Sequence, residues 1–364
     1  MLNRPKSRLV AAAAVAGTVC ALAAAGSAAA APATSLWFSP KNPIPNAFTN
    51  ASPGLAAFYN ASNVRGTFVV WKGQNNNKVM YKYRIGSKWS PSEAIPGGKT
   101  SAGPAAAFYT DPLSKNAELV VWKALNSDTI YYSTGEVTKK GTLNWTTPRS
   151  IMVPGDTLAT TDEGPAVIFP LNSTHARCII AWRGPAHHVR YELGTPSHRL
   201  FTFDSSHWIQ PGTVTSKTTT SNAPALAEVL DTSGNGLVYV FWKADGKGTA
   251  ISYASTPDLK ATGLQGDKSI PWTLLGPVPL ADSTSGPAAS SVNTHGFGPL
   301  LLAYKGPGGL SIRYQTLSGG VWSAYAYVTG PNNTTTQGPA LINGTLANIS
   351  PTSSGRIYLH YYLG

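Results

Sequence analysis

The chain has 364 residues, a formal net charge of +12 and two cysteines, with 12% charged and 10% aromatic residues. This length is enough for one large domain with its own apolar core. Two cysteines exclude the dense disulfide framework of small secreted scaffolds, so sheets and their packing must hold the fold.

Residues 1–30 predict a secretory signal peptide. Arg4, Lys6 and Arg8 precede an Ala/Val/Leu run that ends in three alanines, a small-residue cleavage site. No other apolar stretch approaches the roughly 18 residues of a membrane span. We therefore expect an exported protein without a transmembrane anchor, extracellular or associated with the cell wall, whose domain spans residues 31–364. Only Cys178 remains there, which excludes an internal disulfide.

Trp37 comes before the first repeated unit of the chain, whereas the last unit stops at Tyr362 without a fourth strand. We predict that the segment around Trp37 supplies the missing outer strand of the C-terminal unit. Closing a ring in this way removes sheet edges that would otherwise promote aggregation. The last unit shows no third strand in its sequence, which leaves a three-stranded last sheet open.

From residue 53 the chain repeats one unit, seen most clearly between Gly103 and Trp145. Each unit opens with Gly-Pro-Ala or a variant, and its short apolar and aromatic runs are separated by turn residues. Such runs predict four antiparallel strands, which form one propeller blade.

The aromatic residues of the repeat mark the strands. They are Trp71, Trp122, Trp182, Trp242, Tyr304 and a fragment at Tyr361 for the second strand, Tyr81, Tyr132, Tyr191, Tyr253 and Tyr314 for the third, and Trp89, Trp145, Trp208, Trp272 and Trp322 for the fourth. A period of 50 to 63 residues is typical of propellers. We predict one all-β propeller of six four-stranded blades. A seventh blade within residues 136–144, 195–207 or 254–271 is the alternative.

A basic residue follows the second-strand aromatic in five units, and antiparallel geometry places it beside the Gly-Pro-Ala entries on one face of the ring, which we name the top face. A charge there is either a solvated strand end or part of a ring that attracts an anion. Top-face loops add Gln74, His187 and His188. The predicted ligand-binding set is Lys72, Gln74, Lys123, Arg183, His187, His188, Lys243 and Lys305.

The charges are unevenly distributed along the chain. All 16 carboxylates lie between Glu93 and Asp282, so both flanks are basic, and closing the ring makes these flanks neighbours. We name the resulting surface the basic wedge; its residues are Lys72, Lys78, Lys82, Arg84, Lys88, Arg313 and Arg356. The wedge either keeps the protein soluble or docks an anionic cell-wall polymer.

Catalytic signals are weak in the sequence. Among the predicted first strands only Glu228 is acidic, whereas a glycosidase needs two carboxylates about 5–10 Å apart. The aspartate turn of sialidases and the common hydrolase and phosphate-binding motifs are missing. Five of the seven histidines belong to the third unit, without metal-ligand spacing. We expect a protein that is not an enzyme and that needs neither a cofactor nor a metal.

The repeat resembles exported bacterial propellers, as in Ile312-Arg313-Tyr314 followed by Val321-Trp322-Ser323. This group includes fucose-binding propeller lectins and the dispase autolysis-inducing protein. The lectins imply multivalent sugar binding between blades, and the dispase-related protein implies contact with secreted enzymes, including cross-linking by transglutaminase. We therefore expect a glycan or an anionic wall polymer, bound through repeated sites, as the partner. A secreted protein is the alternative, and we expect no nucleic acid.

Overall fold

The computed structural model describes residues 36–110, 116–153, 157–170, 178–194, 208–214, 219–230, 233–246, 248–257, 270–292, 296, 298–351 and 354–363. The predicted signal peptide lies outside these residues, as do His175, His198 and His207. Apart from one short 3-10 helix, Pro185–His187, the described residues form only strands and connections. Among them, no helix is long and apolar enough to cross a membrane.

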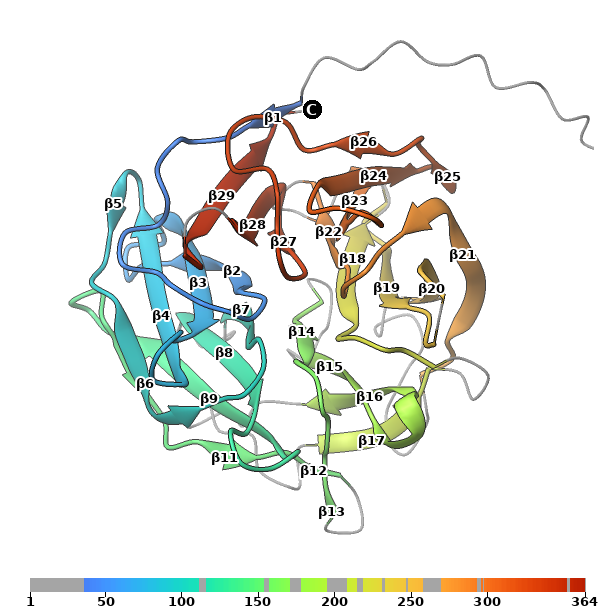
Figure 1. The fold of residues 1–364 in the computed structure, drawn as a ribbon. Coiled ribbons are helices and arrows are strands. Elements are labelled where there is room, and N and C mark those ends of the chain that lie inside the picture. Colours follow the sequence, from blue (N-terminus) through green and yellow to red (C-terminus); the bar gives the residue numbers. More distant parts are fainter. Residues whose placement is uncertain are drawn as a thin grey trace, which may run out of the picture. The chain divides into compact units, whose positions relative to one another are not determined.

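Six antiparallel sheets surround one axis (Figure 1). Blade 1 contains β2 (Gly54–Tyr59), β3 (Arg65–Lys72), β4 (Lys78–Ile85), β5 (Lys88–Trp89) and β6 (Glu93–Lys99). Blade 2 contains β7 (Ala105–Thr110), β8 (Asn116–Lys123), β9 (Ile130–Val137), β10 (Leu143–Trp145) and β11 (Arg149–Ser150). Blade 3 contains β14 (Ala166–Ile168), β15 (Cys178–Arg183), β16 (Val189–Gly194) and β17 (Trp208–Thr213).

The second half of the chain repeats this order. Blade 4 contains β18 (Ala225–Leu230), β19 (Gly236–Lys243), β20 (Ala250–Pro257) and β21 (Thr273–Asp282). Blade 5 contains β22 (Ala288–Ser291), β23 (Leu300–Lys305), β24 (Ile312–Ser318), β25 (Val321–Trp322) and β26 (Ala326–Tyr327). Blade 6 contains β27 (Ala340–Ile342), β28 (Thr345–Ile349), β29 (Ile357–Tyr362) and β1 (Trp37–Phe38). A small sheet of β12 (Met152–Val153) and β13 (Thr157–Leu158) follows blade 2.

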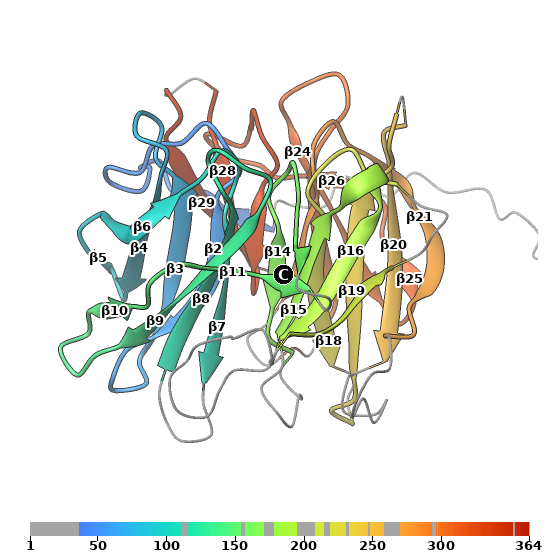
Figure 2. The same cartoon turned by 90° about the horizontal axis from the view of Figure 1, so that it is seen from below.

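The first strands of the six blades form a closed inner ring. β2 contacts β7, β7 contacts β14, and the series continues through β18, β22 and β27 back to β2. Within each blade the strands run between the two faces of the ring (Figure 2). The prediction of a six-bladed propeller is therefore confirmed, and the described residues leave no gap in the inner ring for a seventh blade.

The N-terminal segment closes the ring, as predicted. In β1, Trp37 pairs with Tyr362 and Phe38 pairs with Tyr361. The backbone continues along the same strand, because Ile44 donates to the Ile357 carbonyl at 2.8 Å. The last blade is thus four-stranded, with β29 as its third strand. The assignment of Tyr361 to a second strand was wrong, because the true second strand, β28, carries no aromatic residue.

A polar network replaces the missing aromatic residue in blade 6. Asn348 occupies the register position that Trp122 has in blade 2, since Ala347 pairs with the entry residue Ala340 as Val121 pairs with Ala105. His360 Nε2 lies 2.8 Å from Asn348 Oδ1, and His360 Nδ1 lies 2.6 Å from Ser39 Oγ. Burial lowers the pKa of His360 to about 4. This buried network joins the N-terminal segment to the last blade.

Neighbouring blades meet through one repeated aromatic contact. The outer-strand tryptophan of a blade packs edge-on against the third-strand tyrosine of the preceding blade. The described pairs are Tyr81–Trp145 at 5.1 Å between ring centroids, Tyr191–Trp272 at 5.8 Å, Tyr253–Trp322 at 5.5 Å and Tyr314–Trp37 at 5.5 Å. Each such pair contributes about 0.5–1.5 kcal/mol beyond the area it buries. The second-strand aromatics are at most 3% exposed, which makes them core residues.

Two glutamates are buried between blades. Glu118 of β8 and Glu192 of β16 are both 0% exposed, and neither carboxylate has a hydrogen-bond partner among the described residues. Burial raises the pKa of Glu118 well above its ordinary value and that of Glu192 to about 8. Burial thus favours the protonated form of both carboxyl groups.

We expect Trp37→Ala to lower the free energy of unfolding by about 3–5 kcal/mol, because it removes a buried ring that contacts Tyr314 and Tyr362. Phe38→Ala is the matched control, since Phe38 lies in the same strand and is 56% exposed. Thermal melting compares the two variants. Equal melting temperatures would contradict closure by this strand.

Glu192 makes stability depend on pH. Its pKa is raised on folding, so the unfolded chain releases a proton that the folded protein retains between pH 4.5 and about 8. Stability should fall across this window by up to about 1.4 kcal/mol per pH unit. Glu192→Gln removes the titration, so denaturant unfolding of this variant should show a shallower decline. An unchanged decline would show that Glu192 is not the group responsible.

Candidate functional site

The six entry loops meet at the top end of the axis and line a cavity of about 410 Å³. Each loop is fixed by one hydroxyl, which donates to the carbonyl two residues later at 2.8–3.1 Å. The six hydroxyl residues are Thr49, Thr100, Thr161, Thr220, Ser283 and Thr335. Such turns hold the backbone that follows in one conformation. The cavity therefore has a rigid rim.

The glycines of the Gly-Pro-Ala entries are required by close approach of neighbouring loops. A Cβ added at Gly103 would lie 2.4 Å from the Ser52 carbonyl oxygen, and one at Gly164 would lie 2.4 Å from that of Gly103. A Cβ at Gly338 would lie 2.7 Å from the Gly286 oxygen. The glycine, present in five of the six entries, thus allows neighbouring loops to approach each other at the axis; the fourth entry has Ala223 instead.

Two adjacent acids give this cavity its charge. Asp162 and Glu163, from the entry loop of blade 3, are the only charged residues among the described residues that line it. Burial and the neighbouring Asp162 raise the pKa of Glu163. Amide side chains of Asn222 and Gln337 line the same space. Neither acid lies on a first strand, where catalytic carboxylates were expected; the signal for both is the segment Thr161-Asp162-Glu163-Gly164 of the blade 3 entry.

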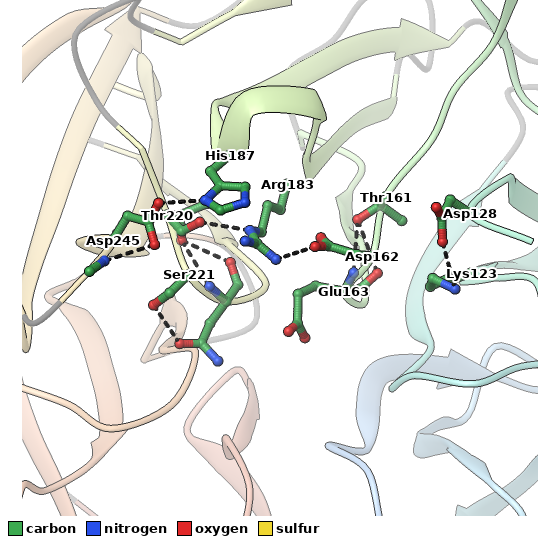
Figure 3. A network of polar contacts seen from close by, with 12 residues as sticks. Lys123, Asp128, Thr161, Asp162, Glu163, Arg183, His187, Thr220, Ser221 and Asp245 are labelled. Carbon is green, nitrogen blue, oxygen red and sulfur yellow. Dashed lines mark hydrogen bonds and ion pairs between the residues drawn. The ribbon is translucent and has the colours of Figure 1, made fainter.

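The basic residues of the top face are largely engaged by the entry loops (Figure 3). Lys123 Nζ lies 3.1 Å from both Ser101 Oγ and Asp128 Oδ1. Arg183 contacts Asp162, and its Nε donates to the Thr220 carbonyl at 2.8 Å. These contacts place the positive charges beside acids, so the predicted ring is partly neutralised in blades 2 and 3.

The remaining members of the predicted ligand-binding set are placed differently. Lys243 is 8% exposed and donates to Ser221 Oγ at 2.7 Å. Lys305 donates to the Thr336 carbonyl at 3.4 Å, and Lys72 is half-buried. Gln74 is exposed beside the N-terminal segment, where its N–H donates to the Phe48 carbonyl at 3.2 Å. Whether these residues bind a ligand stays a prediction.

His187 joins blades 3 and 4 at the top face. Its Nδ1 lies 2.5 Å from Asp245 Oδ2, and this hydrogen bond lowers the pKa of Asp245. The turn is unusual, because Ala186 and His187 both have left-handed φ angles, 55° and 64°. His188 pairs with Thr219 in a short bridge. Arg183 and His187 are thus joined through Thr220, whose N–H donates to the His187 carbonyl at 2.8 Å and whose carbonyl accepts from Arg183 (Figure 3).

The basic wedge contains both buried and exposed side chains. Lys82 is 3% exposed and donates to the Pro45 carbonyl at 2.6 Å, and burial lowers its pKa. Arg84 lies 5.3 Å from the ring of Tyr361, which brings blades 1 and 6 together. Arg313 and Arg356 also lie over aromatic rings, whereas Lys78 and Lys88 are exposed.

The expectation that the wedge contains no acid was wrong. Glu93 belongs to β6, which pairs with β4 of blade 1, and its side chain is exposed. The sequence analysis placed this residue beyond the wedge because β6 follows the outer-strand tryptophan. Among the described residues, no group of three or more metal-ligating side chains is assembled.

Comparisons with known proteins show similarity at the level of the fold. No protein-family model matches the chain, and no curated protein matches it. Among solved structures, a triple mutant of AofleA from Arthrobotrys oligospora matches with a TM-score of 0.54 and 9% identity, covering 85% of this chain and 78% of that one. A fucose lectin from Kordia zhangzhouensis also matches, but the match covers 40% of this chain with a TM-score of 0.32. This similarity is too low to support a conclusion about the fold or the ligand.

Two further matches are carbohydrate-active enzymes. The GH93 α-L-arabinofuranosidase of Fusarium graminearum, in complex with arabinobiose, matches with a TM-score of 0.51 and 12% identity, covering 89% of this chain and 98% of the enzyme. The α-L-arabinanase of Penicillium chrysogenum, also with arabinobiose, matches with a TM-score of 0.51 and 11% identity, covering 90% and 96%. The chain shares a propeller fold with proteins that act on carbohydrates.

These matches contradict the prediction that the protein is not an enzyme. The prediction treated a lack of paired carboxylates on the first strands as evidence against catalysis in a propeller. The entry loops were left out, and one of them places Asp162 and Glu163 side by side in the axial cavity. The content of the first strands is therefore no ground for excluding catalysis.

Proposed function

We propose that the protein binds a neutral, hydroxyl-rich saccharide in the top cavity. The observation that carries this proposal is the convergence of six rigid loops, with the acids Asp162 and Glu163, on one cavity of about 410 Å³. This volume lies in the usual range of small-molecule sites. The match to two arabinan-degrading enzymes supports carbohydrate as the ligand class.

The polar groups of the lining suit sugar hydroxyls. Sugar hydroxyls both donate and accept, and ionised carboxylates accept short, charge-assisted hydrogen bonds from them. The amides of Asn222 and Gln337 supply donors as well as acceptors. Because Asp162 and Glu163 are the only charged residues of the lining, an anionic ligand on the axis is disfavoured.

The differences between the loops favour one asymmetric binding site over several equivalent sites. The residue after each loop hydroxyl is not the same in all blades. It is Asn50 in blade 1, Asp162 in blade 3, a serine in blades 2 and 4 (Ser101, Ser221) and a threonine in blades 5 and 6 (Thr284, Thr336). Only blade 3 contributes carboxylates to the cavity. The saccharide would therefore take one orientation, with its most polar edge toward Asp162 and Glu163.

We expect glycan-array screening of the full chain to find a neutral saccharide. The double variant Asp162→Asn, Glu163→Gln should then bind it about 10- to 100-fold more weakly by calorimetry, because hydrogen bonds to charged groups are lost. Asp245→Asn is the control, since Asp245 lies on the same face but does not line the cavity. Equal affinity of the double variant and the parent would reject this site.

An anionic wall polymer at the basic wedge is the second candidate. Lys78, Lys88 and Arg356 are exposed, and the described residues from 298 to the C-terminal end of β29 contain no acid. Exposed contacts of this kind are screened beyond about 8 Å at physiological salt. The polymer would therefore bind weakly and would dissociate as salt rises. Binding to a secreted protein, implied by the resemblance to the dispase autolysis-inducing protein, stays a prediction.

Retention on purified cell wall tests this second candidate. Lys72→Glu, Lys78→Glu and Lys88→Glu together should abolish retention at low salt, whereas the same change at Lys139, Lys140 and Arg149 should have little effect. The second set is exposed on blade 2, so both variants change the net charge equally. Equal losses would show that only the total charge matters. Lys82 is unsuitable for this test because it is buried.

A further inference from the structure

The lower half of the axis holds a second cavity, separate from the entry loops. Its volume is about 370 Å³, and it is lined by residues of the six first strands. The layer nearest the top is apolar, with Leu55, Ala106, Val167, Leu226 and Leu341 among its side chains.

The lower layer of this cavity has two chemically different halves. At the third residue after the strand-opening alanine, blades 2 to 6 place Phe108, Phe169, Glu228, Ser291 and Asn343. In blade 1 the equivalent register position is Ala57, and Tyr59, two residues further along β2, lines the cavity as well. Blades 1 to 3 therefore present three aromatic rings, and blades 4 to 6 present three polar side chains.

The aromatic half is pre-organised. Tyr59 and Phe108 lie 4.7 Å apart between ring centroids, and Phe169 stacks on Tyr109 at 4.9 Å. Opposite them, Glu228 is 9% exposed and is the only charged residue among the described residues that line the cavity. Aromatic faces and a carboxylate both attract positive charge, and the attraction strengthens as water is excluded.

The balance of polar and apolar groups distinguishes between ligand classes. A saccharide needs partners for many hydroxyls, but only four lining side chains other than Tyr59 are polar: Glu228, Ser290, Ser291 and Asn343. An alkylammonium ion needs one counter-charge and an apolar surround. We propose that the lower cavity binds a small organic ammonium ion, with Glu228 as its counter-charge and Tyr59, Phe108 and Phe169 around its alkyl groups.

Choline and tetramethylammonium are the probes, with 3,3-dimethylbutan-1-ol as the uncharged analogue of choline. The full chain should bind choline at least tenfold more tightly than the uncharged analogue by calorimetry. Glu228→Gln should weaken choline binding at least tenfold and remove the preference for the charged compound. Asp128→Asn should leave choline binding unchanged, because Asp128 is exposed and lines neither cavity.

Phe169→Leu provides a second variant that keeps apolar bulk and leaves Glu228 in place. It should weaken the binding of choline and tetramethylammonium. Its thermal melting should remain cooperative, which shows that the variant is folded. No binding of either ammonium ion at millimolar concentration, or equal choline binding by Glu228→Gln and the parent, would overturn the proposal. Saccharide binding that is lost in Glu228→Gln would also overturn it. Loss of saccharide binding only in the Asp162→Asn, Glu163→Gln variant would support the saccharide site of the top cavity. It would leave the test of the lower cavity to the choline measurements.

Discussion

The structure depends on the contact between the outer-strand tryptophan of one blade and the third-strand tyrosine of the preceding blade. Because half of each contact belongs to the neighbouring sheet, no blade completes its own core. The ring must therefore close, and Trp37 at the start of the domain does so by packing on Tyr314 of blade 5. At this closure, the buried Asn348 and His360 hold blade 6 together by hydrogen bonds in place of a second-strand tryptophan.

Closure of the ring determines which loops and strands meet at the axis. Six loops and six first strands meet there, and the glycine of the entry motif is what lets neighbouring loops approach. Around this rim, Lys123, Arg183 and Lys243 are bonded to loop hydroxyls, carbonyls and acids. The ring of basic residues suggests an anion site in the sequence. In the structure, three of its five members form hydrogen bonds that hold the entry loops.

Function in such a repeat arises where the blades differ. The residues that support the repeat are nearly the same in each unit, whereas the positions that face the axis vary. Blade 3 places two acids in the top cavity, and blade 4 places Glu228 in the lower one. The two cavities share an axis and a layer of first-strand residues between them, but their polar groups differ, so they suit different ligands.

The sequence by itself determined the strand pattern, the six blades, the closing role of Trp37 and the face on which the basic residues lie. The strand pattern follows from the periodicity within one repeat. The number of blades and the closing strand follow from the order of the repeats along the chain. Only the tertiary structure decided that Lys82 is buried, that Glu93 joins blade 1 and that Asn348 replaces a tryptophan. It also decided which side chains line the two cavities. The reason is physical: each cavity is made by residues from six separate strands or loops, and their register and burial are fixed only when the ring is closed.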